Sequence, residues 1–471
     1  MSADLSLVKQ SAVSLVAKIK SRQISAVEVL DAHLAQIDKF NPTLNAVVTL
    51  DAERAKMRAA EIDQEIAAGR DPGPLAGLPV LIKDVTLTKG LRTTFASPLY
   101  KDFVPDVDAT PVARLRQAGA IILGKTNTPE FATGATTFND VFGITRNPWD
   151  PTKTPSGSSG GSAAAAASGM APLAHGTDFG CSVRMPASFC GLVGLRPTPG
   201  LIPNEPMHLP WDPGQVHGPL ARSAEDAALM LDAMTGLDDT WPLSFAPPWA
   251  SALDLVRATQ DAKGKRIAYV SDIAGLGVDT EVDALCRAGA QRLADFGAQV
   301  EEITFDCSDG FDAYKVLRGE WMVGQQIERL AMIEKFGANL SGNVKAGLAL
   351  TPREIAEAEL MREKVWSRFK TFFAQYDFLI TPCSPVAPFA AEEKFPTQIN
   401  GKKLENYIDW IAPCFLITLV GFPAGSVPAG LTQSGLPVGM QIIGKRFSEP
   451  QILGLCKLAQ QAQPIGWPKL S

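Results

Sequence analysis

Two serines set among small residues are the clearest candidates for chemistry in this chain. Ser158 lies in the run Pro-Ser-Gly-Ser-Ser-Gly-Gly-Ser at 155–162, and Ser182 follows the run Gly-Thr-Asp-Phe-Gly-Cys at 176–181. Small residues let a backbone turn sharply and approach a ligand closely. Successive backbone N–H groups around Ser182 could point at one oxygen, as an oxyanion hole requires. These segments indicate a serine nucleophile beside an anion-binding turn.

The same segments also have a simpler interpretation. Glycine and serine at 155–162 are typical of a flexible linker, and an isolated Gly-x-Ser is more often a structural turn. The position of 155–162 argues against a linker, because Asn147-Pro-Trp149 precedes it and an alanine-rich helical pattern follows directly. A glycine/serine turn that enters a helix is also an anion-binding device. The Gly-x-x-x-x-Gly-Lys-Ser/Thr motif of a phosphate loop is absent.

Lys83 is the third candidate. It follows the apolar run Leu78-Pro-Val-Leu-Ile82, which would carry it into the interior or to a strand end. Burial lowers the pKa of a lysine and leaves it neutral, able to accept a proton. A buried ion pair with Asp84 is the alternative interpretation.

Nucleophiles of other kinds are less favoured. Ser182 lies between Gly180-Cys and Val-Arg184, so it does not match the Gly-x-Ser-x-Gly elbow of histidine-dependent hydrolases. Cys181 has no evident histidine partner in the sequence, and we interpret it as a packing residue.

The elements that would position these residues follow an alternating order. The pattern predicts strands at 78–82 and 120–123, with helices at 113–118 and 163–170 between and after them. This order predicts an α/β fold with helices on both faces of a sheet. Further strands are expected at 266–270, 300–305, 378–382, 424–428 and 438–443, and further helices at 52–68, 224–234, 282–296, 312–337, 352–375 and 449–461.

Two helices are expected within residues 5–40. Ser25 followed by Glu28 predicts a capping box at the start of the second helix, and Asn41-Pro42 predicts its end. No internal repeat or long linker divides the chain, so we expect one domain over 1–471. Its parts are N-terminal helices (1–70), a core with the candidate residues (71–235), a variable helical insertion (236–400), and C-terminal strands with a closing helix (401–471).

Composition excludes several classes of function. The chain has 471 residues, 46% hydrophobic and 20% charged, and a formal net charge of −6, which argues against a nucleic-acid-binding surface. The seven cysteines show no metal-ligand spacing, so neither a zinc site nor a disulfide framework is expected. The N-terminus does not resemble a signal peptide, and no apolar run is long enough to span a bilayer. We therefore expect a cytoplasmic protein that binds no membrane.

Taken together, the candidate segments resemble the amidase signature family. The resemblance covers most of the chain, and only about 240–370 carries little signal. Its motifs lie at 77–84, 124–131, 146–149, 156–162, 176–186, 190–198, 218–222, 421–425 and 435–444.

The resemblance implies an amidase signature fold, with a large mixed, twisted β-sheet and helices on both faces. It implies hydrolysis of amide C–N bonds through an acyl-enzyme on Ser182, with Lys83 as the base. Ser158, in a cis peptide with Gly157, matches the serine that bridges them. The remaining matches are Phe179, Gly180, Cys181 and Ser182, whose backbone amides form the oxyanion hole, Asp178 and Arg184, which brace this loop, and Ser159, which adds a hydrogen bond.

The resemblance implies no cofactor and no metal. The implied partners are a small-molecule amide and water, and a homodimer is plausible for the family. Two positions depart from the family pattern, because Ser156 and Cys181 stand where glycine is usual. Neither departure removes a catalytic side chain, but both could narrow the acyl side of the pocket.

Three other functions remain open. An amidotransferase A-type subunit, which works only within a complex, usually has glutamine where this chain has Met185, and Ser-Leu-Asp-x-x-Gly-Pro where this chain has Pro-Gly-Gln-Val-His-Gly-Pro at 213–219. Both departures favour a free-standing hydrolase. An inactive binding scaffold is less favoured because Lys83, Ser158 and Ser182 are all present. An esterase is the third, because the same site cleaves esters.

The loop at 204–212 is expected to overhang the site. If its apolar residues line the pocket, they favour aryl or otherwise apolar amides, with carbamates as a further class; ordinary loop packing is the equal alternative. The candidate wall residues are Phe142, Met185, Met207, Leu209 and Trp211.

Overall fold

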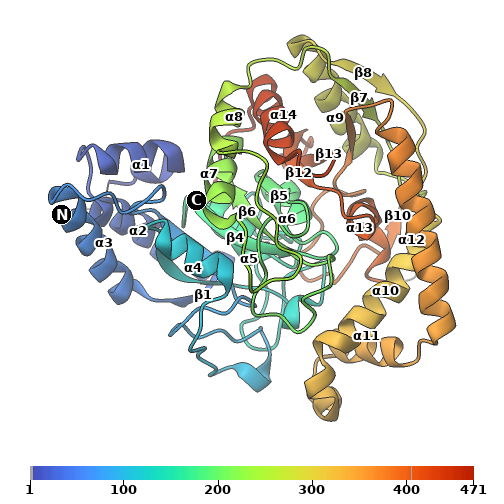
Figure 1. The fold of residues 1–471 in the computed structure, drawn as a ribbon, viewed down its shortest axis with the longest axis horizontal. Coiled ribbons are helices and arrows are strands. Elements are labelled where there is room, and N and C mark those ends of the chain that lie inside the picture. The colour runs from blue at the N-terminus through green and yellow to red at the C-terminus, as the bar shows by residue number, and fades with distance from the viewer. Residues whose placement is uncertain (1–3, 405, 471) are drawn as a thin grey trace.

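One mixed sheet runs through the middle of the molecule (Figure 1). The structure, a computed structural model, describes residues 4–404 and 406–470, and within them eleven strands join into this sheet. The order across the sheet is β1 (Val47–Leu50), β3 (Ile121–Thr126), β2 (Pro79–Lys83), β4 (Leu173–Asp178), β6 (Val216–Ala221), β5 (Val193–Arg196), β12 (Ala424–Leu431), β13 (Pro437–Gly444), β9 (Phe378–Pro382), β7 (Arg266–Tyr269) and β8 (Gln299–Glu302). A separate two-stranded ribbon pairs β10 (Gln398–Ile399) with β11 (Lys402–Lys403).

The sheet is antiparallel in the middle and parallel toward its two flanks, except that the edge strand β1 pairs antiparallel with β3. Strands β3, β2 and β4 run parallel, as do β9, β7 and β8, whereas the strands from β4 through β6, β5, β12 and β13 to β9 alternate in direction. The predicted large mixed sheet is confirmed. Strands β4, β5 and β6 were not predicted, because buried strands carrying Gly176, His217 and Pro219 show no apolar alternation.

Helices cover both faces, as the sequence predicts. On β13, Ile442 packs into a core with helices α7 (Ala224–Met234), α9 (Thr280–Gln291) and α14 (Glu449–Ala462). Its neighbour Ile443 packs into a second core with α10 (Gly310–Gln325), α12 (Pro352–Phe372) and α13 (Ala412–Leu419). Successive side chains of a strand point to opposite faces, so this division places a helical layer on each side. Helix α8 (Ala252–Ala258) packs on α7 and α14.

The N-terminal helices are α1 (Ala12–Lys20), α2 (Ala26–Leu44) and α3 (Ala52–Ala67). The capping box is confirmed, because Ser25 Oγ accepts from the Glu28 N–H at 3.0 Å and the Glu28 carboxylate accepts from the Ser25 N–H at 2.8 Å. The predicted end at Asn41-Pro42 is wrong, since α2 continues to Leu44. Asn41 closes this last turn instead, by accepting from the Asn45 N–H through its carbonyl oxygen.

Two short helices lie buried in the centre of the molecule. Helix α4 (Thr110–Gln117) lies outside the sheet, but α5 (Gly160–Ala167) is fully buried and packs against β4 and against α6 (Arg184–Cys190). Because α5 carries only glycine, serine and alanine, its backbone lies close to the strands that carry the candidate residues.

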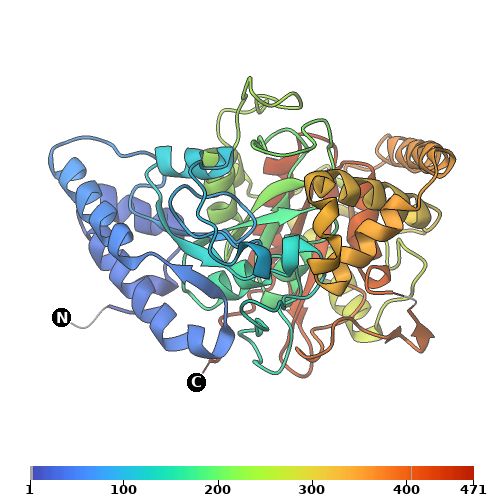
Figure 2. The same ribbon diagram turned by 90° about the horizontal axis from the view of Figure 1, so that it is seen from below.

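Residues 310–372 form a helical group at the end of the sheet opposite the N-terminal helices (Figure 2). The group contains α10 (Gly310–Gln325), α11 (Ala338–Leu348) and α12 (Pro352–Phe372). The single helix predicted over 312–337 is wrong, because the chain tightens at Gln326 into a 3-10 segment, η5 (Ile327–Lys335). Spacing of apolar residues does not separate these two helix types over a few turns.

Two further observations concern the described residues. None of the helices in residues 4–404 and 406–470 has the length and apolar character needed to cross a membrane. All seven cysteines lie in this part of the chain, and each is buried and free.

Candidate functional site

The ends of two neighbouring parallel strands bring Lys83 to Ser158. Lys83 is the last residue of β2, and Thr177 lies near the end of β4 beside it. The Lys83 Nζ donates to Ser158 Oγ at 2.7 Å and to Thr177 Oγ1 at 2.9 Å. Ser158 enters from the turn before α5, and its peptide bond with Gly157 is cis. The two hydroxyls therefore hold the amine in one place inside the protein.

Ser182 lies in the turn between β4 and α6. It lines the same cavity as Ser158 and Thr177, and it is 9% exposed, whereas Lys83 is fully buried. The Ser159 N–H donates to the Ser182 carbonyl oxygen at 3.3 Å, which ties the two serine segments together. Ser159 Oγ lies 3.3 Å from both the N–H and the carbonyl oxygen of Thr177. The structure thus gathers Lys83, Ser158 and Ser182 at one place.

Burial sets the charge of Lys83. Desolvation lowers the pKa of this amine to about 7, against smaller opposing effects of Asp178 and Cys181. Near pH 7, Lys83 is therefore neutral in a large fraction of the protein molecules, and the neutral amine can accept a proton. The ion pair with Asp84 is not formed; the Asp84 carboxylate instead accepts from Thr94, and its charge interactions are with Lys125 and Arg92.

A buried ion cluster braces the turn that carries Ser182. The Asp178 carboxylate accepts from Arg184 at 2.9 and 3.1 Å and from the Val183 N–H at 3.0 Å, while Arg196 Nη1 donates to the Asp178 carbonyl oxygen at 2.7 Å. Burial would raise the pKa of Asp178, but the two guanidinium groups hold it at about 2. Asp178 and Arg184 were expected here; Arg196 was missed, although it ends the apolar run of β5.

Four backbone N–H groups in this turn are left for a ligand. No hydrogen bond between described residues engages the N–H groups of Phe179, Gly180, Cys181 or Ser182. Phe179 is held in place, because its ring stacks on Trp321 at 4.1 Å and its carbonyl oxygen accepts from the Tyr314 hydroxyl at 3.4 Å. Fixed, unpaired donors beside a serine are the arrangement that stabilises an oxyanion.

Gly180 and Cys181 show why the turn has its composition. A Cβ at position 180 would lie 2.9 Å from the Tyr314 hydroxyl, so a larger residue would push this wall away. The Cys181 thiol contacts the Gly157 carbonyl oxygen at 3.5 Å, and burial raises its pKa well above the usual value. A thiol held protonated is a poor nucleophile, which agrees with its interpretation as a packing residue.

Two adjacent chambers lie at and beside Ser182. The inner chamber, about 50 Å³, is lined by Ser158, Ser182 and the 179–181 turn, together with Tyr314, Arg318, Tyr407, Ile408 and Ile411. The outer chamber, about 400 Å³, is lined by Phe95, Tyr100, Phe103, Met207, His208, His217 and Arg329, among others. Phe131, Thr177, Trp321 and Met322 line both. The small chamber therefore lies at the serines, and the larger, aromatic chamber lies directly beside it.

Most of the predicted wall residues lie elsewhere. Met207 lines the outer chamber, but Trp211 is 74% exposed and lines a separate hollow with Pro213 and Trp366. The chain reverses there, because the Asp212 N–H donates to the Leu209 carbonyl oxygen, and this turn carries the Trp211 side chain to solvent.

Three more wall predictions need correction. Met185 is fully buried in the core below α6, together with Phe189. Phe142 lies under the Arg92 guanidinium, 5.5 Å from ring centre to carbon, and lines neither chamber. Leu209 packs against Gly324 of α10, behind the chamber wall.

The walls that sequence reasoning missed come mainly from α10. Tyr314, Arg318, Trp321 and Met322 lie on this helix, within the region that carries no motif. An amphipathic helix gives no sign of which face meets a cavity, so only the tertiary structure identifies them. In the described part of the chain, no cluster of three histidine, cysteine or acidic residues could hold a metal ion.

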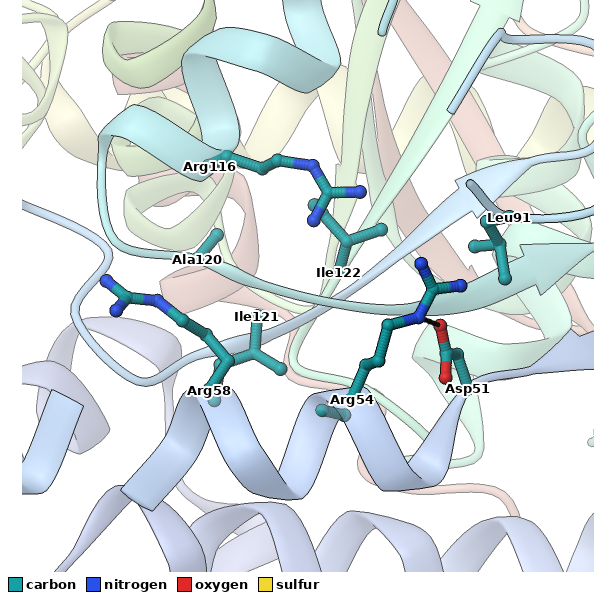
Figure 3. Close-up of a pocket in the computed structure, with 9 residues that line it drawn as sticks. Asp51, Arg54, Arg58, Leu91, Arg116, Ala120, Ile121 and Ile122 are labelled. Carbon is teal, nitrogen blue, oxygen red and sulfur yellow. Dashed lines mark ion pairs between the residues drawn. The ribbon is translucent and has the colours of Figure 1, made fainter. Parts of the chain in front are cut away.

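A second pocket lies between α3 and α4 (Figure 3). Arg54 and Arg58 reach it from α3, and Arg116 from α4. Each guanidinium already has a carboxylate partner: Arg54 pairs with Asp51, Arg58 with Glu61 and Glu65, and Arg116 with Asp108. Balanced, partly exposed pairs without a nucleophile do not make a catalytic site, so the chambers at Ser182 remain the candidate.

Comparison with known proteins identifies the family of this chain. A family model described as Amidase matches residues 28–453. The chain is 36% identical to an acylamidase of Rhodococcus erythropolis, over 94% of this chain and 93% of the relative. It is 35% identical to the A-type subunit of the Glutamyl-tRNA(Gln) amidotransferase of Alkaliphilus metalliredigens (strain QYMF), over 92% of each. A bacterial aryl acylamidase of the amidase signature family superposes with a TM-score of 0.89 at 29% identity, over 96% of each chain. The chain therefore belongs to the amidase family, and it is an amidohydrolase with the amidase signature fold.

Proposed function

We propose that this protein is a free-standing serine amidase that cleaves amides with an aryl or otherwise apolar amine side, through an acyl-enzyme on Ser182. The observation that carries this proposal is the contact of 2.7 Å between the buried Lys83 amine and Ser158, in the chamber that also holds Ser182. A neutral amine, a bridging hydroxyl and the Ser182 hydroxyl in the same chamber would provide a path for one proton.

The reaction follows from this path. Neutral Lys83 takes the proton of Ser158 as Ser158 takes that of Ser182, and the Ser182 oxygen attacks the amide carbonyl. The free N–H groups of the 179–182 turn receive the oxyanion. The same path then returns the proton to the leaving nitrogen as the C–N bond breaks. Water enters and gives up a proton along the same path, and its oxygen attacks the acyl carbon. The bond to the Ser182 oxygen then breaks, and that oxygen takes the proton back along the path, so the free acid leaves and the enzyme is restored.

The aromatic outer chamber supports an apolar amine side. The Phe95 ring stacks on Phe131 at 5.2 Å, and Tyr100 meets both rings edge to face at 5.3 and 5.6 Å. Such walls favour flat aromatic groups over small polar ones. The likeness to an acylamidase and to an aryl acylamidase supports the same class. Aryl carbamates and esters present the same carbonyl to Ser182 and are further candidates.

An amidotransferase component is the second candidate, because a relative of that kind reaches 35% identity. Met185 and the 213–219 segment depart from the pattern of those proteins, and this favours the free-standing enzyme. A component of such a complex would require partner chains for activity, whereas the proposed amidase works alone.

One experiment tests the proposal and separates the two candidates. Amine release is measured from primary amides, acyl anilides and aryl carbamates with the purified chain alone and with Ser182→Ala. We expect release by the wild type, fastest from the anilides, and none by the variant. Release by both would refute Ser182 as the nucleophile. If the wild type releases no amine until partner chains are added, the amidotransferase would be favoured.

A further inference from the structure

The inner chamber holds a buried cation that has no acidic partner. Arg318 of α10 is 8% exposed and lines this chamber. Its Nη2 donates to the Tyr407 hydroxyl at 2.9 Å, and its Nη1 donates to the Asn343 side-chain oxygen. The guanidinium also lies 5.8 Å from the centre of the Tyr407 ring. Among the described residues, no carboxylate lies within ion-pair distance of it.

The surroundings do not neutralise this charge. Among the residues that the structure describes, no aspartate or glutamate lines the inner chamber. The buried carboxylate behind the serine turn, Asp178, already faces two arginines, Arg184 and Arg196. A buried ion is costly unless it is paired. A guanidinium binds a carboxylate through two parallel N–H bonds, and only two of its five N–H groups are used here. The chamber is therefore electrostatically prepared for an anionic group.

The path of the proton indicates which part of a substrate meets Arg318. The leaving nitrogen must receive its proton from Ser158, which is hydrogen-bonded to Lys83. Lys83 also donates a hydrogen bond to Thr177, and Thr177 lines the outer chamber. The amine product must leave before water attacks, so it belongs on the side that opens outward. The acyl group stays bound to Ser182 and belongs on the inner side, toward Arg318 and Tyr407.

We propose that Arg318 binds a carboxylate on the acyl group of the substrate, so that this enzyme prefers monoamides of short dicarboxylic acids. The inference rests on the proposed function, because it assumes that Ser182 carries the acyl group. The amine side remains apolar, in the aromatic outer chamber. Such a substrate is a neutral aryl amide at one end and an anion at the other.

Matched substrates test this preference. Glutaryl p-nitroanilide and pentanoyl p-nitroanilide have acyl chains of similar length, and only the first ends in a carboxylate. We expect the wild type to show a kcat/KM about 10- to 100-fold higher for the glutaryl compound, since one charge-assisted pair gives that much discrimination. In Arg318→Gln the ratio of the two kcat/KM values should fall to about one. Arg116→Gln, which alters an arginine of the pocket in Figure 3, is the matched control and should keep the wild-type ratio.

A binding measurement keeps the inference separate from catalysis. Calorimetry with Ser182→Ala should show tighter binding of glutaranilic acid than of pentananilide, and Ser182→Ala/Arg318→Lys should weaken this preference while keeping the charge. If Ser182→Ala prefers the charged compound but the wild type hydrolyses neither compound, the carboxylate-binding role of Arg318 would be supported and the proposed hydrolysis would be overturned. Equal binding and equal turnover of the charged and neutral compounds would overturn the inference and leave the amidase proposal standing. A preference that persists in Arg318→Gln would also overturn it.

Discussion

The pKa of Lys83 makes a direct prediction about the pH dependence of activity. Burial lowers this pKa to about 7, and only the neutral amine can accept the proton from Ser158. Below pH 7 the active fraction should fall tenfold for each pH unit. At pH 5 we therefore expect kcat/KM about 100-fold below its plateau, because this quantity reports ionisation of the free enzyme.

Two buried groups near the site do not titrate in this range. Burial lowers the pKa of His217 to about 3, and the pKa of Asp178 is about 2, so neither changes charge between pH 5 and 9. A third buried group, Lys125, does titrate there, because burial lowers its pKa to about 8. Its amine bonds to Thr88 and Thr93, not to the serines, so it should not set the profile.

The assay is the initial rate of anilide hydrolysis from pH 5 to 9 at constant ionic strength. Lys83→Arg keeps a positive charge at every pH in this range, so we expect a loss of about 10²- to 10⁴-fold, the usual contribution of a proton-transfer group. Lys125→Met should retain an acidic limb with a pKa near 7. A flat wild-type profile, or a limb that moves with the Lys125 substitution, would refute the assignment of Lys83 as the base.

Four further results are expected. The lowered pKa of Lys83 corresponds to a contribution of about 5 kcal/mol to the free energy of unfolding of the wild type, which is fully present above pH 10.5 and is lost as the pH falls to 7. Lys83→Met should therefore lack this rise in the free energy of unfolding between pH 7 and 10.5. Urea unfolding of both proteins at several pH values measures the difference. Asp178→Asn leaves two buried arginines without a counter-charge and should destabilise the protein by about 3–5 kcal/mol in the same assay. Trp321→Ala should reduce the preference for anilides over N-methylamides by about 3- to 10-fold in competition assays. Trp211→Ala should leave this preference unchanged, because the side chain is 74% exposed; a change would mean that the 204–212 loop closes over substrate.

The residues that we propose carry out the chemistry could be singled out in the sequence because their surroundings are restrictive. Lys83 is buried because it ends an apolar strand. Ser182 lies in a turn that requires glycine at position 180, because a Cβ there would lie 2.9 Å from the Tyr314 hydroxyl. Such constraints leave short motifs in the sequence. The sheet could be anticipated from β2, β3, β9, β12 and β13, whose apolar runs are typical of buried strands.

The walls of the chambers were not predictable from the same information. Trp211 and Trp321 are both tryptophans in segments without motifs, yet one faces solvent and the other stacks on Phe179. Which of them meets the substrate depends on how α10 packs against the 204–212 loop. This contact joins positions more than a hundred residues apart, and no local pattern encodes it. Strands β4 and β6 were missed for a related reason, since their burial on both faces removes the alternation that marks a strand.

The separation of walls from chemistry also bears on how such an enzyme can change over evolutionary time. Lys83, Ser158 and Ser182 belong to the sheet and the turns fixed to it, whereas Trp321, Met322 and Arg318 project from a helix contributed by a different stretch of the chain. Substitutions on that helix reshape the space around a substrate without moving the proton path. A lineage can therefore exchange one amide for another through a few changes in α10, while the residues of the proposed proton path remain intact throughout.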